Sequence, residues 1–348
     1  CAGGIPQKNR TNPIEVVVAA LEMQSRIQEI QKQTHTNRKK YWELRIGIHT
    51  GPIIAGVVGS KKFSYDIWGD SVNIASRMES SGEVGKVNIS ESTFLLVQDF
   101  FDCEHRGKIP VKYKGEVDMY FVNGFKAEYS DDPQRIIPNK KFNLKFALLK
   151  FEDLQEMMFE RFEKELPKNL YYHNLKHTID VVVQTEIIGL EEKVSDEEML
   201  LLKTAALFHD AGFLLAYMDH EDLGAQLVKS ILPRFNFTEE QIQQIVELIL
   251  VTKLPHKPKN LLEKIMCDAD LDYLGRDDYF PVSRDLYREL IEHSMITKSE
   301  YEWNKMQIKF LQNHRFFTES SKRRRNENKN KQIQKLQEQT RSFNKINL

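Results

Sequence analysis

The sequence predicts two domains in series, an α+β domain followed by an all-α domain. Its 348 residues, of which 41% are hydrophobic and 29% charged, are enough for two hydrophobic cores rather than one. Alternating and helical hydrophobic patterns are mixed in the first third of the chain, whereas almost all of the pattern after residue 145 is helical. The charges around Pro133 and Pro138 are typical of a linker between the two domains.

The first domain is expected to start with a helix and continue with two strands. Asn12 and Pro13 are typical of an N-cap and a first-turn proline, and the apolar residues after them have helical spacing, which predicts an amphipathic helix over residues 13–33. Apolar residues alternate over 44–48, and a β-rich run follows at 53–58. These two segments are predicted to be short strands joined by a turn.

A second helix and a hairpin are expected to complete this domain. The apolar residues of 71–80 have helical spacing, and Asp70 or Ser71 is the expected N-cap. Residues 106–122 end in a run of aromatic and β-branched residues, which predicts a closing β-hairpin. The mixture of strands and helices therefore indicates an α+β domain.

The rest of the chain is predicted to form helices and a basic tail. Helical patterns lie at residues 152–165, 175–190, 196–215, 239–250 and 299–312. Residues 321–348 carry nine Lys or Arg against two Glu, which predicts a frayed or isolated, solvated helix rather than a binding arm. The expected boundaries are 1–127 for the first domain, 128–144 for the linker, 145–315 for the helical domain and 316–348 for the tail.

Composition limits the partners and the compartment. A formal net charge of -1 gives no basic footprint for nucleic acid, so no nucleic-acid partner is expected. Cys1, Cys103 and Cys267 lie far apart without a CxxC pair, which fits a cytoplasmic protein and excludes a cysteine-based metal site. No apolar run approaches the roughly 20 residues that span a bilayer, so no membrane segment is expected in this chain. Because the chain opens at Cys1, we expect upstream residues that could include a tether.

Asn73 and Arg77 are candidates for a phosphate-facing pocket wall. They lie four residues apart on the helix predicted over 71–80, so both side chains project from one face. An arginine offers planar, permanently charged donors to the oxygens on which charge accumulates during phosphoryl transfer. For an isolated pair, a solvated helix face is the plainer interpretation, and the surrounding sequence decides between the two.

Residues 44–80, LRIGIHTGPIIAGVVGSKKFSYDIWGDSVNIASRMES, resemble the central part of class III adenylyl and guanylyl cyclases, and the resemblance extends over about residues 1–127. It implies a ferredoxin-like βαββαβ fold that is incomplete at the N-terminus. It also implies that Asn73 orients the ribose and that Arg77 stabilises the α-phosphate in the transition state. In the segment RGKIPVKYKGEVDMYFV, Lys114 matches the lysine that reaches the phosphates.

Asp66 stands where this resemblance implies that the base is chosen. A carboxylate accepts a hydrogen bond from the exocyclic amine of adenine, whereas it repels the carbonyl of guanine. Related guanylyl enzymes usually carry Cys or a similar small residue there, so the expected reaction is conversion of ATP to cyclic AMP and pyrophosphate. The alternatives are a structural role for Asp66, as a carboxylate that caps the next turn, and guanylyl cyclase activity for the domain.

The resemblance also implies metal ions and a second subunit. In this family two Mg²⁺ or Mn²⁺ ions are held by two Asp residues, which would lie upstream of Cys1 together with a base-reading Lys. The chain alone is therefore not expected to cyclise ATP. Each site of the family draws on both partners of a head-to-tail dimer, so we expect a homodimer through this domain.

Four segments of the helical half together resemble the HD superfamily of metal-dependent phosphohydrolases. They are YYHNLKHTID at 171–180, ALFHDAGF at 206–213, DHEDLGA at 219–225 and CDADLDYLG at 267–275. The resemblance implies an all-α fold in which His177, His209, Asp210 and either Asp268 or Asp270 bind one divalent ion. Imidazole and carboxylate ligands suit Mn²⁺, Fe²⁺, Zn²⁺ or Mg²⁺.

Three more residues of these segments are candidates for the chemistry. The HNxxH arrangement of His173 and His177 is similar to that of cyclic nucleotide phosphodiesterases, which implies that His173 is a general acid; a histidine hydrogen-bonded to a neighbouring helix is the alternative. His220 and Glu221 are expected to support the ligands or to bind a second ion. The substrate is left open among phosphate esters, cyclic nucleotides included, and a non-catalytic regulatory module is the alternative.

Overall fold

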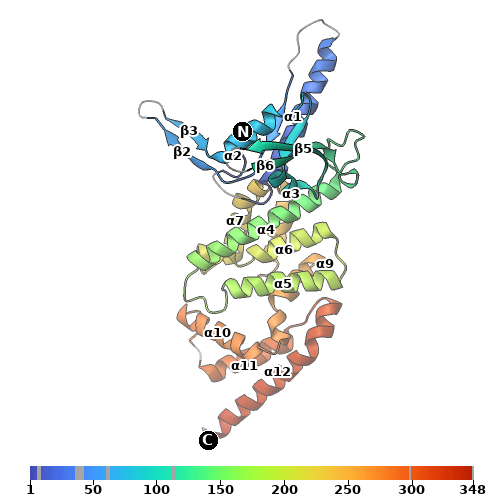
Figure 1. Cartoon of the computed structure of the whole chain (residues 1–348). Helices are drawn as coiled ribbons and strands as arrows, with labels where there is room; N and C mark the ends of the chain where they lie inside the picture. Colours follow the sequence, from blue (N-terminus) through green and yellow to red (C-terminus); the bar gives the residue numbers. More distant parts are fainter. Residues whose placement is uncertain (6–8, 36–42, 60–62, 112–114, 298, 347–348) are drawn as a thin grey trace. The chain divides into compact units, whose positions relative to one another are not determined.

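The computed structural model describes residues 1–5, 9–35, 43–59, 63–111, 115–297 and 299–346. It divides into two compact units, Cys1–Lys150 and Phe151–Leu348, which are described separately. The first unit combines a sheet with helices and the second is helical, so the predicted order of an α+β domain and an all-α domain is confirmed (Figure 1). Among the described residues, no helix is both long enough and apolar enough to cross a bilayer.

A four-stranded sheet forms the centre of the first unit, in the order β1-β4-β6-β5. Its strands are β1 (Ile46–Ile48), β4 (Val87–Ser90), β5 (Phe101–Val111) and β6 (Gly115–Phe125). Strand β1 pairs with β4 in parallel, and the long β5–β6 hairpin is antiparallel. This hairpin confirms the one predicted over 106–122 and extends beyond it at both ends.

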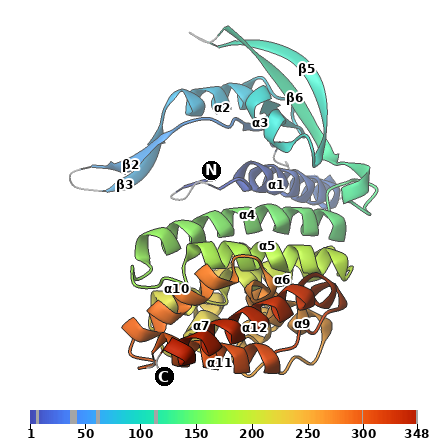
Figure 2. The same cartoon turned by 90° about the horizontal axis from the view of Figure 1, so that it is seen from below.

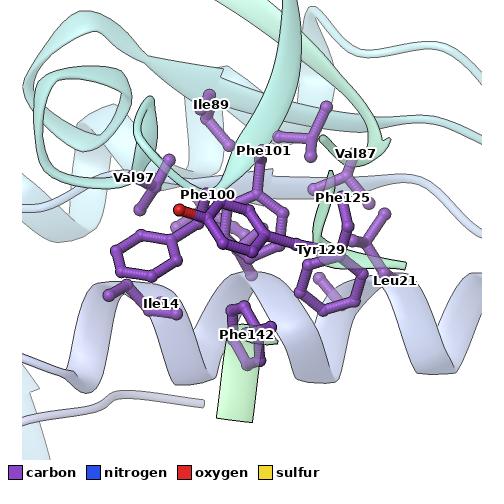
Figure 3. Packing of buried hydrophobic residues seen from close by; sticks show 14 residues of the cluster. Ile14, Leu21, Val87, Ile89, Val97, Phe100, Phe101, Phe125, Tyr129 and Phe142 are labelled. Carbon is purple, nitrogen blue, oxygen red and sulfur yellow. The ribbon is translucent and has the colours of Figure 1, made fainter. Parts of the chain in front are cut away.

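Helices cover both faces of this sheet. They are α1 (Asn12–His35), α2 (Asp70–Ser80) and α3 (Glu91–Val97), followed by the short η1 (Ala127–Tyr129). Ile14 and Leu21 of α1 pack with Val87 and Ile89 of β4 on one face, and Figure 3 shows this cluster between the helix and the strands. Helix α2 places Ile74 and Met78 against Met119 of β6, whose side chain points to the opposite face.

Aromatic side chains join the end of the hairpin to the start of the next helix. The rings of Phe101 and Phe125 are stacked with centroids 5.0 Å apart, and Phe142 meets Phe125 edge-on at 4.7 Å (Figure 3). Phe142 belongs to α4 (Lys140–Glu165), whose first turns therefore lie in the first unit. The expected linker over 128–144 thus contains a helix start as well as turns.

Strands β2 (Ile54–Val58) and β3 (Ser64–Trp68) form a separate antiparallel hairpin that projects from the sheet of the first unit (Figures 1 and 2). The two short strands predicted at 44–48 and 53–58 are confirmed as β1 and β2. They pair with β4 and β3 rather than with each other, and β3 is a strand that the pattern did not predict. Large apolar side chains on this hairpin are exposed: Ile54, Val57, Val58, Phe63, Tyr65 and Trp68.

The start of α2 differs from the prediction by one residue. The N-cap is Gly69 rather than Asp70 or Ser71. Gly69 has a φ of 134°, a conformation that side chains with a Cβ rarely adopt, so the backbone geometry decided this position. The Ser71 hydroxyl instead donates to the carbonyl of Pro52 at 2.7 Å, which fastens the helix to the turn before β2.

The second unit is a bundle of helices. After α4 it contains α5 (Leu175–Glu191), α6 (Asp196–Phe208), η2 (Ala211–Leu214), α7 (His220–Ile231), η3 (Leu232–Phe235), α8 (Glu239–Leu250), α9 (Leu261–Asp270), η4 (Asp272–Gly275), α10 (Tyr279–Glu292), α11 (Glu300–Asn313) and α12 (Glu319–Ile346). Capping boxes at Ser195, Thr238 and Ser299 fix the starts of α6, α8 and α11. These helices confirm the helical segments predicted from periodicity.

The basic tail is helical, but the prediction of an isolated, solvated segment was wrong. Helix α12 packs against α11 and η4, and Leu336 belongs to a buried cluster with Phe316 and Leu311. Polar side chains of α12 are also buried, among them Ser321, Lys329 and Gln332. A few residues of α12 therefore make enough buried contacts to pack the helix onto the bundle, although the segment is polar on average.

Candidate active sites

Four side chains from three helical segments of the second unit converge on one point. His177 lies in the first turn of α5, His209 and Asp210 directly follow α6, and Asp270 is the last residue of α9. The Nε2 atom of His177 lies 3.2 Å from Nε2 of His209 and 3.4 Å from the nearest oxygens of Asp210 and Asp270. We call these four residues the HD cluster.

Three members of the HD cluster are spaced like the ligands of a single ion, because the ligand atoms of His177, His209 and Asp270 all lie within 4.8 Å of one another, and Asp210 lies beside the two histidines. Atoms bound to one ion at about 2.1 Å lie about 3.0 Å apart at a right angle and about 3.4 Å apart at a tetrahedral angle. The Nε2 atom of His209 lies 3.2 Å from Asp210 and 3.6 Å from Asp270. Oδ2 of Asp210 is buried without a hydrogen-bond partner among the described residues, so this oxygen is available to a cation.

The surroundings prepare His209 to bind through Nε2. Its Nδ1 lies 2.8 Å from the carbonyl of Ala206, an acceptor to which Nδ1–H donates, so Nε2 is the nitrogen that faces the cluster. Burial acts to lower the pKa of His209, but the carboxylates of Asp210 and Asp270 and the hydrogen bond to Ala206 together outweigh it and raise the pKa to about 9. Burial acts to raise the pKa of Asp210, whereas the imidazolium charges of His209 and His173 hold it well below its usual value. The cluster thus favours positive charge at its centre.

The structure separates the two aspartates that the sequence left open. Asp270 contributes to the HD cluster, whereas Asp268 is fully buried elsewhere and accepts hydrogen bonds from the backbone of Phe317 and Thr318, both at 2.8 Å. Two residues are slightly more than half a helical turn, so side chains at positions 268 and 270 point in different directions. The suggestion of Asp268 as a ligand was therefore wrong.

His173 lies beside the cluster and is oriented by a residue that sequence reasoning missed. Its Nδ1 is hydrogen-bonded to Glu289 of α10, and its ring stacks on Phe213 with centroids 4.6 Å apart. Glu289 also accepts from the backbone N–H of Tyr172 at 2.8 Å. Burial lowers the pKa of His173, but the carboxylates of Asp210 and Glu289 outweigh it, so the pKa is raised overall.

His220 and Glu221 start helix α7 at the border of the cluster. The Nε2 atom of His220 lies 3.6 Å from Oδ1 of Asp210 and 3.6 Å from Oε1 of Glu221. Its ring stacks on the ring of Phe213 with centroids 4.1 Å apart, and His173 also stacks on this phenylalanine. His220 thus contacts the Asp210 oxygen that the two cluster histidines leave free.

A small cavity of about 60 Å³ opens beside the cluster. Its lining includes His177 and Asp270 together with the cationic side chains of Lys176 and Arg276. Arg276 is held in place by Asp180 at 3.0 Å. The lining also includes the carboxylates of Asp180, Asp270, Asp272 and Asp285, so the cavity presents charges of both signs.

The cyclase-like residues of the first unit lie on its surface. Asn73 and Arg77 are both exposed on α2, and one guanidinium nitrogen of Arg77 donates to the Pro110 carbonyl of β5 at 2.8 Å. Asp66 is exposed on β3, where it accepts from the backbone N–H of Ile67 at 2.8 Å. Lys114 lies outside the described residues.

Comparison with known proteins assigns one family to each unit. Residues 1–124 match the family model of the adenylate and guanylate cyclase catalytic domain, and residues 174–272 match that of the HD domain. An adenylate cyclase of Mycobacterium tuberculosis is 37% identical over 123 residues, and a receptor-type guanylate cyclase of Caenorhabditis elegans is 40% identical over 131 residues. These alignments cover 35% and 36% of this chain, but only 27% and 11% of the relatives.

A solved structure is also similar to about a third of this chain. The adenylyl cyclase CyaB of Pseudomonas aeruginosa is 27% identical, and the alignment covers 36% of this chain and 67% of that protein with a TM-score of 0.34. The similar proteins thus include enzymes named for adenine and enzymes named for guanine nucleotides. These similarities therefore do not decide whether the nucleotide base is adenine or guanine, and the residues of the site must be used instead.

Proposed function

We propose that this chain, which carries a class III nucleotidyl cyclase catalytic domain followed by an HD domain, belongs to a signalling enzyme with two activities. Its cyclase domain would convert ATP to cyclic AMP and pyrophosphate in a homodimer. Its HD domain would hydrolyse a phosphate ester. The observation that carries the second activity is the HD cluster, in which His177, His209 and Asp270 are spaced for one ion and Asp210 lies beside the two histidines.

The HD domain supplies the elements of a metal-assisted hydrolysis. His177, His209, Asp210 and Asp270 would hold a divalent ion, Mn²⁺, Fe²⁺, Zn²⁺ or Mg²⁺, which when bound lowers the pKa of water and neutralises phosphate charge. His173 would protonate the leaving oxygen through Nε2, since Glu289 occupies its Nδ1. Lys176, which lines the adjoining cavity, would offer a positive charge to the phosphate, whereas Arg276 in the same lining is already paired with Asp180 and Asp278.

The hydrolase is tested by metal binding and by substrate turnover measured together. Mn²⁺ affinity and hydrolysis of a panel of phosphomonoesters and cyclic nucleotides are compared for wild type, His209→Ala and His105→Ala. His105 is a partly exposed histidine of the other unit, paired with Asp118, and serves as the control. We expect His209→Ala to lose both properties. Turnover of every panel member at the background rate, with Mn²⁺ binding intact, would favour the non-catalytic regulatory module.

Adenine is the proposed base because the Asp66 carboxylate has a second oxygen that can accept a hydrogen bond from the base. Oδ1 accepts from the backbone of Ile67, and Oδ2 can accept from an exocyclic amine. Asn73 would orient the ribose and Arg77 would stabilise the α-phosphate. Lys114 would reach the phosphates, and two Mg²⁺ or Mn²⁺ ions would be bound by aspartates outside this chain. Guanylyl cyclase activity is the second candidate, which the comparison of ATP and GTP turnover decides.

The homodimer is supported by the exposed β2–β3 hairpin. Ile54, Phe63 and Tyr65 expose 71%, 75% and 59% of their surface, so the hairpin presents several large apolar side chains to water. Replacing Phe63 and Tyr65 by Ser should shift the chain to monomer in analytical ultracentrifugation. A dimer of unchanged stability in this variant would exclude the hairpin from the interface.

A further inference from the structure

We propose that the C-terminal helix α12 positions the metal-binding Asp270 by fixing the aspartates on both sides of it. The segment that ends α9 reads CDADLDYLG and places carboxylates at 268, 270 and 272. Asp268 accepts hydrogen bonds from residues that directly precede α12, and Asp272 pairs with Arg325 inside this helix. Of the three carboxylates, only Asp270 faces the HD cluster. This inference rests on the metal centre proposed above, and it gives the basic helix α12 the role of positioning a ligand.

The first contact fixes Asp268 to the residues that lead into α12. Asp268 is fully buried and accepts from the backbone N–H groups of Phe317 and Thr318 and from the Thr318 hydroxyl at 2.7 Å. The Thr318 hydroxyl in turn accepts from the backbone of Ser321 at 3.2 Å, inside the first turn of the helix. One carboxylate thus joins the end of α9 to the start of α12.

The second contact fixes Asp272. The Arg325 guanidinium donates to both carboxylate oxygens of Asp272 at 2.8 Å, a bidentate geometry that fixes direction as well as distance. Asp272 is 1% exposed, so this pair is removed from water. Without Arg325, Asp272 would be an uncompensated buried charge, so its position depends on this pair.

The backbone after Asp272 is fixed to the same helix. Asn328 donates to the carbonyl of Gly275 at 3.1 Å, and Gln332 donates to the carbonyl of Arg276 at 3.2 Å. A Cβ atom at Gly275 would lie 2.5 Å from Cβ of Arg325 and 2.6 Å from its carbonyl oxygen. Glycine is therefore required here for α12 to approach the chain this closely.

These contacts affect the metal centre because ligand direction governs affinity. A carboxylate binds well when its position is set by its own fixed neighbours, and losing such support commonly weakens metal binding 10- to 100-fold. Asp270 ends its helix, where the backbone is least constrained by helical hydrogen bonds. Fixing residues 268 and 272 on α12 restricts the one residue between them that binds the ion.

The test measures binding of Mn²⁺ alone to the full 348-residue chain, with free Mn²⁺ followed by its paramagnetic resonance. Arg325→Ala removes the bidentate contact, and Gly275→Ala pushes α12 away without removing any charge. We expect both variants to bind Mn²⁺ about 10-fold more weakly than wild type. Arg323→Ala is the control, since Arg323 carries the same charge on the same helix, is 69% exposed and pairs with Glu191.

Asp270→Asn and the melting temperature of the metal-free protein separate the outcomes. A helix with a merely structural role would lower the melting temperature in Arg325→Ala and Gly275→Ala, yet leave their Mn²⁺ dissociation constants at the wild-type value, and this result overturns the inference. If Arg325→Ala does not fold, Gly275→Ala decides by the same comparison. Unchanged Mn²⁺ binding in Asp270→Asn would instead overturn the metal centre itself.

Discussion

His173 and Glu289 are 116 positions apart in the sequence, yet Nδ1 of the imidazole is hydrogen-bonded to the Glu289 carboxylate. Glu289 is fully buried on α10 and receives two further hydrogen bonds from the backbone of Tyr172 and His173. Such a carboxylate fixes both the tautomer and the direction of the ring. The remaining nitrogen, Nε2, is then the one that can donate a proton to a substrate.

Glu289→Gln tests this orientation. An amide keeps the shape of the side chain but removes the charge that supports a protonated His173, so phosphate-ester hydrolysis should fall about 100-fold in kcat. Mn²⁺ affinity should stay unchanged, because Glu289 makes no contact with the HD cluster ligands. Glu292→Gln, an exposed carboxylate on the same helix, is the control. Wild-type kcat in Glu289→Gln would mean that His173 is no general acid.

Arg77→Ala should reduce cyclic nucleotide formation about 100-fold or more in a protein that contains this chain and the expected upstream aspartates. The stability should change by about 0.5 kcal/mol or less, since Arg77 is exposed on α2. Arg77→Lys should not restore the rate, because an ammonium lacks the planar fork of donors. Arg45→Ala, at an exposed arginine paired with Glu79, is the control. A melting curve and a turnover assay on each variant distinguish loss of fold from loss of chemistry.

Asp66→Cys should shift the preference of the cyclase from ATP toward GTP. The thiol is a weak hydrogen-bonding group and no longer repels the guanine carbonyl, so a roughly 10-fold change in the ratio of kcat/KM for the two nucleotides is expected. Asp70→Cys, on the exposed first turn of α2, is the matched control. An unaltered ratio in Asp66→Cys would indicate that Asp66 has only a structural role.

His314 should make the second unit less stable in mild acid. Burial, and after it the charges of Lys329 and His256, lower the pKa of His314 to about 3. The unfolded chain takes up a proton near pH 6.5 and the folded chain does not, so stability falls as the pH drops below that value, by up to about 2 kcal/mol between pH 7 and pH 5. Urea unfolding of wild type and His314→Gln at the two pH values measures this loss. A pH dependence that is the same in both proteins would contradict the assignment.

The sequence alone determined those features that depend on neighbouring residues and on contiguous motifs. Hydrophobic periodicity is a local property, so the helices from 152 to 312 and the order of an α+β and an all-α domain were predictable. The histidines of the HNxxH and HD motifs were also predictable, because each motif fixes its own spacing. The separate pairing of β2 with β3 was not, since strand partners are chosen by long-range contacts.

Only the tertiary structure decided which charged groups face the HD cluster and which of them support it. Asp268, Asp270 and Asp272 have the same chemistry and the same spacing, and the difference between them comes from helix α12, more than 40 residues downstream. Glu289 has no motif of its own, so its contact with His173 could not be inferred from the sequence. The composition of α12 also predicted a solvated segment. The average polarity of its 28 residues does not show that a few of them are buried in contacts with distant helices.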